Sequence, residues 1–573
     1  RCAGRPLRRA APRRFASRAK AVQGSPLVSF QLDTREVRHM APQVLSAAVA
    51  AAGSSRHTGE PLWRAYRERC LALRQRLTPR DVRLVLQGFA EAAARDEGVV
   101  PQLLGEHLWR EAAEVSSFDL CAMAVALAKL GVTDGAAFEG IAARVLADLE
   151  ALEFTQLASL ANAFSRASCR HPELFRAVAG RFRERAAAAP GELPPAAVTL
   201  VLNAYAVCAF CDAPLWEALL ASVVVPRVAD FSVTQAALIA DSMARCSQAV
   251  PQAAPALGAL AEHWLACDLL DHAGPEDLTY IARSYARLGV AGHDELNRAL
   301  AASALRQLSA FNGRQLAAFA GALMRLPSKG FEAFMAMALR HSVPYLLPEL
   351  SLGELSLLVE ALLASKLPVP PATAQAIFQR SAERAQESVS SASGGREGEA
   401  GEERRAVGNR TLASLAAGSV QLLSAQQGPQ LLAALRPLAL ALAGGKRMKL
   451  RALTSWLVAH AHFQVRDVEA FNHVAVFVVG GLEEGSANAR VDQLLIALGK
   501  LRAPVEPLLR LIDARLAEAA PRLSLGAVAH GLLASCTLGA EHLSKEAVAA
   551  LLARARELCA AAAPEPLEAA RLA

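Results

Sequence analysis

The chain has 573 residues, of which 53% are hydrophobic and only 5% aromatic, and its formal net charge is +7. That length exceeds what one compact core organises, and no stretch approaches the ~20 uninterrupted apolar residues of a membrane-spanning helix. Because residues 1–32 carry eight Arg and Lys and no acid, the remainder has a net charge of only −1. Bulk charge therefore gives no argument for a nucleic-acid partner.

The first 32 residues are rich in Arg, Ala and Ser. This composition is typical of an organelle transit peptide, so we predict import into the mitochondrial matrix, with the plastid stroma as the alternative. A disordered basic tail that binds RNA or a membrane is a further interpretation. Residues 33–77 are predicted to form an N-terminal cap or a degenerate repeat, in which Trp63, Tyr66 and Cys70 have helical spacing.

From residue 78 onward one helical template recurs, as the aligned segments 157–166 and 278–287 illustrate. Its first residue, the anchor, recurs about twelve times at a spacing of roughly 38 residues. The anchors are Val82, Leu120, Leu157, Val198, Ala236, Leu278, Leu316, Leu355, Leu412, Leu453, Val491 and Leu525. A fixed period of this length is typical of stacked repeats.

The columns of the template predict how each unit packs. Residues three after the anchor are large and apolar, and residues six after it are Gly, Ala or Ser. The apolar positions form one buried stripe of a helix, and the small column beside it lets a neighbouring helix approach closely. A second helix follows, as at 136–152, 172–186 and 294–308. Because one pair cannot bury both stripes, we predict an all-α fold, an α-solenoid of about twelve stacked helix pairs.

The predicted array has two blocks, residues 78–387 and 409–573. The Ser-, Gly- and Glu-rich segment between them, residues 388–408, has no apolar period and is predicted to be a disordered insertion. Hydroxyl side chains precede several apolar stripes and are expected to cap the helices that follow. These candidate caps are Thr78, Ser117, Thr155, Ser232 and Ser351.

No combination of residues points to catalysis. Phosphate-binding loops, dinucleotide fingerprints, serine-hydrolase elbows and zinc-protease helices are missing from the sequence, so we predict neither an enzyme nor a cofactor. Cys208 and Cys211 have the spacing of a metal or redox pair but no matching second pair, which favours buried core residues. His460 occupies the large apolar column, so a packed core histidine is favoured over a metal site with His462 and His473.

One polar pattern repeats along the array. Residues nine after the anchor lie about 180° from it on a helix, and many are cations that face away from the buried stripe. These candidate phosphate contacts are Lys129, Arg166, Arg245, Arg287, Arg325 and Lys500. Residues five after the anchor, one turn earlier on the same face, are polar and variable. The candidate base-facing residues among them are Asn162, Asn203, Asp241 and Arg283.

Such a ladder predicts a binding site for single-stranded RNA, in which cations follow the phosphates and the variable residues meet the bases. The alternative is that a cation near a helix C-terminus only complements the helix dipole, an effect of ~0.3–1 kcal/mol each. The repetition of the pattern in successive units favours the RNA interpretation, whereas the nearly neutral body of the chain counts against it.

Residues 126–131, Ala-Leu-Ala-Lys-Leu-Gly, and 285–289, Tyr-Ala-Arg-Leu-Gly, resemble the core of the octotricopeptide repeat. They are also similar to the heptatricopeptide units of RAP-domain and FAST-kinase-like organelle proteins, although no RAP domain is recognisable after Leu533. The resemblance implies an organellar RNA-binding α-solenoid that acts in transcript processing, stability or translation, or as a mitoribosome-associated factor. Its partners would be single-stranded mRNA or rRNA and ribosomal or other organellar proteins.

A function from a different class remains open. HEAT-like units have a similar length and build protein-binding scaffolds. The same stacked helices would then bind an acidic partner helix, or the chain would be a structural subunit of an organellar complex.

Overall fold

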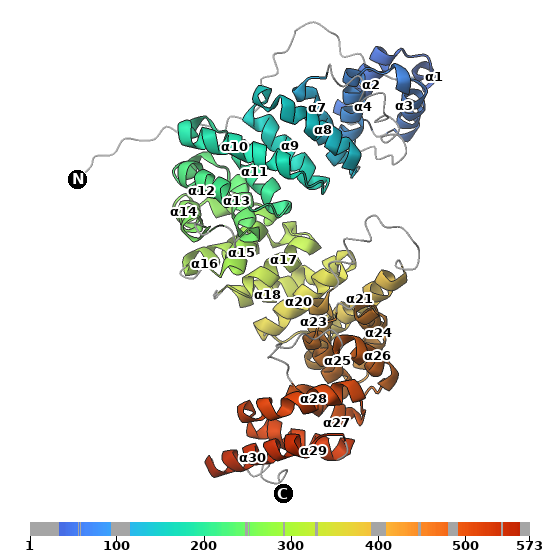
Figure 1. The fold of residues 1–573 in the computed structure, drawn as a ribbon, viewed down its shortest axis with the longest axis vertical. Coiled ribbons are helices and arrows are strands. Elements are labelled where there is room, and N and C mark those ends of the chain that lie inside the picture. The colour runs from blue at the N-terminus through green and yellow to red at the C-terminus, as the bar shows by residue number, and fades with distance from the viewer. Residues whose placement is uncertain are drawn as a thin grey trace, which may run out of the picture. The chain divides into compact units, whose positions relative to one another are not determined.

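The structure is a computed structural model that describes residues 34–55, 57, 59–92, 115–133, 135–246, 250, 253–289, 293–326, 330–390, 408–444, 448–479, 491–539 and 542–561. These residues form α-helices joined by turns and short 3-10 segments, with no β-strand among them (Figure 1). The predicted all-α solenoid is confirmed. Among the described helices, none is long and apolar enough to span a membrane.

Two of the segments predicted from the sequence include residues that the structure does not describe. The predicted transit peptide, residues 1–32, lies outside the described residues. Of the predicted insertion, residues 391–407 also lie outside them, while residues 388–390 belong to the end of a helix that runs to Ser390.

The chain divides into two compact units, of which the first ends at Val145. Its described helices are α1 (Thr34–Val37), α2 (Pro42–Ser54), α3 (Glu60–Ala72), α4 (Pro79–Glu91), α7 (Ser117–Leu130) and the start of α8 (Gly135–Ala147). Helix α4 packs between α2 and α7. Two glycines bring α2 and α4 together, since a Cβ on Gly88 would lie 2.4 Å from the carbonyl oxygen of Val49, and one on Gly53 would lie 2.5 Å from that of Gly88.

The second unit, from Leu146 onward, contains two layers of helices. In the first, which we call the A-layer, each helix packs against the next one. Its members are α9 (Phe154–Arg166), α11 (Pro195–Val207), α13 (Val233–Arg245), α15 (Pro275–Leu288), α17 (Gly313–Leu323), α20 (Leu352–Ser365), α23 (Asn409–Leu422), α25 (Leu450–Phe463), α27 (Val491–Leu501) and α29 (Leu525–Leu538).

The second helices of the pairs form the other layer, which we call the B-layer. Its members are α10 (Pro172–Ala188), α12 (Ala213–Leu219), α14 (Ala253–Ala266), α16 (Asp294–Arg306), α18 (Phe331–His341), α21 (Pro371–Ser390), α24 (Gly428–Gly444), α26 (Val468–Val479), α28 (Glu506–Ala519) and α30 (Lys545–Ala561). Contacts such as those of α24 with α21 and α26 link successive members. A short helix, α19 (Val343–Leu346), follows α18.

The register of the template is confirmed by burial. Each of the twelve anchors lies in a helix of its own, either in the A-layer or in α4 and α7 of the first unit. Every residue three after an anchor is buried, from Val85 to Val528, and every residue six after an anchor is buried too, from Gly88 to Gly531. The apolar stripe and the small column therefore face the helix contacts, as the spacing predicts.

The ends of the helices agree only in part with the predicted caps. Thr78, Ser232 and Ser351 are N-caps whose hydroxyl oxygens accept the backbone N–H three residues later. Ser117 and Thr155, however, lie inside the first turns of α7 and α9. Ser116 caps α7 instead, and the N-cap residue of α9 is Glu153.

Candidate nucleic-acid interface

The six candidate phosphate contacts lie at the carboxyl-terminal ends of their helices. Arg166 and Arg245 are the last residues of α9 and α13, and Arg325 lies two residues beyond α17. Lys129, Arg287 and Lys500 lie in the last turns of α7, α15 and α27. All six residues are exposed, although the side chain of Arg245, which pairs with Asp241, is only 33% exposed. Their position also suits the helix dipole, so their placement is compatible with both interpretations of the ladder.

The four candidate base-facing residues differ from one another. Asn162 and Asn203 are half-buried, and no other residue that the structure describes forms a hydrogen bond with either side chain. Arg166 lies one turn after Asn162, but the residue one turn after Asn203 is Val207, which is 43% exposed. Among the described residues, an amide beside a cation without an ion-pair partner is therefore found at α9 and not at α11.

Asp241 does not face solvent, because its residue is only 1% exposed. Both of its carboxylate oxygens accept hydrogen bonds from arginines. Nε of Arg245, one turn later on α13, lies 2.9 Å from Oδ2. Nε and Nη2 of Arg283, on α15, lie 2.8 and 2.6 Å from Oδ1. Since a buried carboxylate is tolerated only when paired, Asp241 joins two A-layer helices rather than meeting a base.

Arg283 is held by a second neighbour. Its guanidinium lies over the ring of Tyr280, 5.3 Å from the centroid. The Tyr280 hydroxyl donates a 2.7 Å hydrogen bond to Glu276, on the preceding turn of α15. Burial, and then the hydrogen bond to Glu276, raise the pKa of Tyr280 to about 12, so this phenol is neutral at pH 7. The result is a polar cluster formed by α13 and α15, and Arg287 follows Arg283 by one turn on α15.

A second cluster with the same design lies on α20 and α23. Glu360, five residues after its anchor, accepts hydrogen bonds from Arg410 and from the hydroxyl of Ser414. Burial raises the pKa of Glu360, but these hydrogen bonds and the charge of Arg325 outweigh it and leave the net pKa below its ordinary value. Arg325, a candidate phosphate contact, is therefore part of this cluster.

Arg410 was not among the candidate residues, because it lies two residues before its anchor. A signal for it was nevertheless present in the sequence. Asp241 and Glu360 both lie five residues after their anchors, and each carboxylate pairs with an arginine on the next A-layer helix. An acid at this position therefore predicts a cation on the helix that follows. In the first compact unit the cation lies on the earlier helix and the acid on the later one, since Arg83 on α4 pairs with Asp119 on α7 at 2.6 Å.

The other candidate ligands are core residues. His460 is 2% exposed, its Nδ1 lies 2.9 Å from the carbonyl oxygen of Trp456, and burial lowers its pKa. Cys208 is buried as well, whereas Cys211, the other cysteine of this pair, is only half-buried. The packed core histidine and the buried Cys208 are thus confirmed. In the described part of the chain, no three His, Cys, Asp or Glu side chains form a group that would hold a metal ion.

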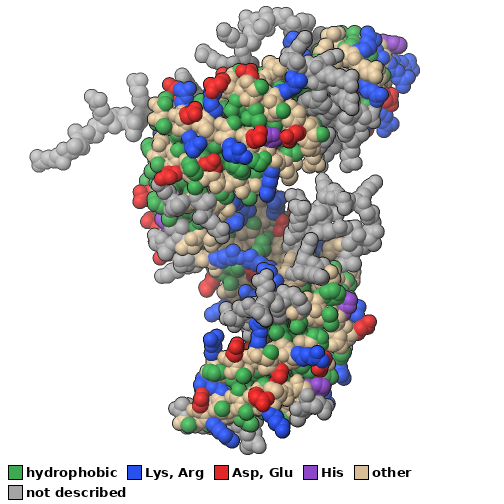
Figure 2. Space-filling view, viewed as in Figure 1, with side chains coloured by type: hydrophobic (Ala, Val, Ile, Leu, Met, Phe, Trp, Pro, Cys, Tyr) green, Lys and Arg blue, Asp and Glu red, His purple; other side chains and the backbone are tan. Residues whose placement is uncertain are grey.

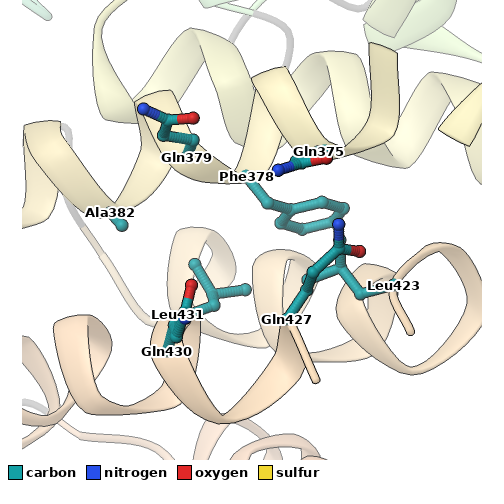
Figure 3. A pocket seen from close by; sticks show the side chains of 8 residues that line it. All are labelled: Gln375, Phe378, Gln379, Ala382, Leu423, Gln427, Gln430 and Leu431. Atoms are coloured by element: carbon teal, nitrogen blue, oxygen red, sulfur yellow. The ribbon is translucent and has the colours of Figure 1, made fainter. Parts of the chain in front are cut away.

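A small pocket of about 140 Å³ lies between α21 and α24 of the B-layer (Figure 3). Glutamine side chains, including Gln375 and Gln430, surround Phe378 and Leu431 there. None of the described residues that line this pocket is charged. The space-filling view shows acidic and basic side chains interspersed over most of the visible face, with Lys and Arg gathered where Figure 1 draws α15, α17 and α18 (Figure 2).

Comparison with known proteins links part of the chain to RNA. Residues 35–273 match the sequence model of a family described as RNA-editing substrate-binding complex 6 protein. This match covers less than half of the 573 residues. It supports the RNA-associated part of the sequence resemblance, while the octotricopeptide or heptatricopeptide type stays a prediction.

The other comparisons add no functional information. No curated protein gives a significant match. A structure described as a homology model of the full-length AP-3 complex in an intermediate open conformation is 10% identical, with a TM-score of 0.29 over 95% of this chain and 92% of that chain. A circular tandem repeat protein is 13% identical, with a TM-score of 0.13 over 91% of this chain and 98% of that chain.

Proposed function

We propose that this protein binds single-stranded RNA along the exposed side of its A-layer helices and acts in organellar RNA processing, stability or translation. The observation that carries the proposal is the set of exposed cations at equivalent ends of several A-layer helices, α9, α13, α15 and α27, with Arg325 just beyond α17. Arg166 and Arg287 form no ion pair within the described residues and are the clearest phosphate contacts. The RNA-associated family match over residues 35–273 supports the same class of function.

In this proposal the cations and the amides contact different parts of the RNA. The exposed guanidinium and ammonium groups bind phosphates, which confers affinity without sequence preference. Asn162 and Asn203, whose amides are half-buried and have no other described partner, meet base edges through hydrogen bonds. Asp241 has no such role in the proposal, because Arg245 and Arg283 occupy its oxygens.

A salt titration tests this function. Fluorescence anisotropy with a labelled single-stranded RNA should give an affinity that falls log-linearly with salt concentration, with a slope of about −0.7 for each phosphate contact. A duplex of the same sequence should bind more weakly, because its base edges are paired and its phosphates follow another path. A chain that binds no RNA at any salt concentration contradicts the proposal.

The protein-binding scaffold is the second candidate, and the ionic clusters favour it. Asp241 and Glu360 offset part of the charge of the cation ladder, because Arg245 pairs with Asp241 and Arg325 lies near Glu360, so less net positive charge faces a ligand than the sequence alone indicates. A scaffold would capture partner proteins from an organelle extract after nuclease treatment. An RNA-binding protein would instead lose its associated material when the RNA is digested.

The proposed location is the mitochondrial matrix, with the plastid stroma as the alternative, and it rests on the composition of residues 1–32. Deleting these residues from a tagged protein that includes any sequence upstream should leave the protein in the cytosol. Imaging of the tag in both forms measures this directly. Continued import of the deleted form would locate the signal elsewhere.

A further inference from the structure

The Arg283 side chain has one free side. Its Nε and Nη2 hydrogens point at Oδ1 of Asp241, so this edge of the guanidinium is occupied. The guanidinium carbon also lies over the ring of Tyr280, 5.3 Å from its centroid. The side chain nevertheless remains 40% exposed. Because a guanidinium is planar, its exposed part offers a flat surface to a ligand.

This orientation is fixed by a buried group rather than by a surface ion pair. An exposed pair holds a long side chain only weakly, because water competes for both partners. Asp241 is shielded from water and hydrogen-bonded to Arg245 as well, so its position is set by α13. Arg283 is therefore presented by α15 in one orientation, with little ordering left to occur when a ligand binds.

We propose that Arg283 and Tyr280 form a stacking site for one unpaired nucleobase, which lies on the open face of the Arg283 guanidinium. Asp241 is the positioning residue of this site. Arg245 and Arg287, exposed at the ends of α13 and α15, bind the phosphates on either side of that nucleotide. The inference rests on the proposed RNA-binding function and specifies how one base is held.

The chemistry of the cluster suits this ligand. Arginine stacks on the flat face of an aromatic heterocycle, and every base has such a face, so the contact does not depend on sequence. The charged groups near the site are Arg245, Arg283 and Arg287 against Asp241 and Glu276, which leaves one net positive charge. An anionic nucleotide is therefore accepted, whereas a stacked cation is not.

The decisive variant is Arg283→Lys, which keeps the positive charge but removes the planar face. Two probes separate stacking from phosphate binding: a single-stranded oligoadenylate, and a ribose-phosphate oligomer of the same length that lacks bases. We expect Arg283→Lys to bind oligoadenylate about tenfold more weakly. The abasic oligomer should bind the variant and the parent equally, and the salt slope should not change, since no cation is lost.

Arg306→Lys is the matched control. Arg306, on α16 of the B-layer, is also an arginine paired with an aspartate, Asp271, but both side chains are exposed, at 55% and 59%, and neither belongs to the proposed site. Its substitution should leave both affinities unchanged. Asp241→Asn weakens the hold on Arg283 and also removes a negative charge, so it should bind the abasic oligomer more tightly while the ratio of oligoadenylate affinity to abasic affinity falls. If Asp241→Asn unfolds, Arg283→Lys still tests the stacking site, because Arg283 is 40% exposed and its substitution leaves the buried carboxylate with a cation.

The outcomes separate this inference from the proposed function. If the parent binds no RNA, both fail. If the parent binds oligoadenylate but Arg283→Lys binds it equally well, the stacking site is refuted and RNA binding stands. An equal loss on both probes also refutes it, because the role of Arg283 would then be structural or electrostatic.

Discussion

Gly88 and Gly531 occupy the same small column of the template, yet a methyl group should have opposite effects at the two positions. At Gly88 a Cβ would lie 2.4 Å from the carbonyl oxygen of Val49 and 2.8 Å from its Cγ1, so α2 or α4 must shift. At Gly531 the nearest heavy atom, Cδ1 of Leu551, lies at 3.6 Å, which is an ordinary van der Waals contact.

The magnitudes follow from two opposing effects. Overpacking costs about 1–3 kcal/mol, whereas replacing glycine by alanine inside a helix stabilises it by about 0.5–1 kcal/mol. At Gly88 the clash is with backbone and exceeds the helical gain, so Gly88→Ala should lose about 1–2 kcal/mol. Gly531→Ala should gain about 0.5–1 kcal/mol, because only the helical effect remains.

Hydrogen exchange resolved by peptide is the appropriate assay, since stacked repeats open locally and one melting temperature does not describe them. Gly88→Ala should speed exchange in α2 and α4 and leave α29 unchanged. Gly531→Ala should slow exchange in α29. If both variants protect their helices as well as the parent or better, the close contact of α2 with α4 is wrong, and with it the use of the small column as a helix contact.

Two further predictions concern titratable groups. Because the net pKa of Glu360 is lowered, its contact with Arg410 stabilises the fold above the ordinary carboxyl pKa and is lost as the pH falls through the folded value. Glu360→Gln should therefore unfold at lower urea than the parent at pH 7, and the two should converge in acid; a difference independent of pH would contradict this. Burial raises the pKa of the Cys70 thiol to about 12, so at pH 8 it should resist alkylation while the exposed Cys559 reacts. Mass spectrometry of labelled peptides measures the alkylation rates of both thiols, and equal rates would show that Cys70 is accessible.

The fold was predictable because the repeat places the same kinds of residue at the same steps in every unit. Val85 and Trp456 differ in size, but both lie three residues after an anchor and both are buried. Pattern alone identifies such positions, since a helix that stacks on its neighbours has one face to bury. The same reasoning identified His460 as a core residue although its side chain is polar.

The arrangement of the polar residues was less predictable. Helical spacing places Asp241 on the polar face of α13, but it does not show that Arg283 of the next helix reaches across to it. Arg410 was missed for the same reason, because its partner Glu360 lies 50 residues away in the sequence. Pairing between helices depends on their relative offset and on rotamers, and a one-dimensional pattern contains neither. The cap of α7 shows a smaller error, since either Ser116 or Ser117 fits the pattern.

The measurement that tests RNA binding by the A-layer most directly is the salt slope of a double variant, Arg166→Ala with Arg287→Ala. Both side chains are exposed, and neither forms an ion pair within the described residues, so their removal leaves no buried carboxylate without a partner. The control is Arg176→Ala with Arg298→Ala, which removes two exposed arginines from α10 and α16, the B-layer helices that follow α9 and α15. The slope of log affinity against log salt should become shallower by about 1.4 in the A-layer variant, or about 0.7 for each lost phosphate contact, and should not change in the control. An A-layer variant with the affinity and slope of the parent would show that these cations only complement their helix dipoles, and the protein-binding scaffold would then be the better account of this chain.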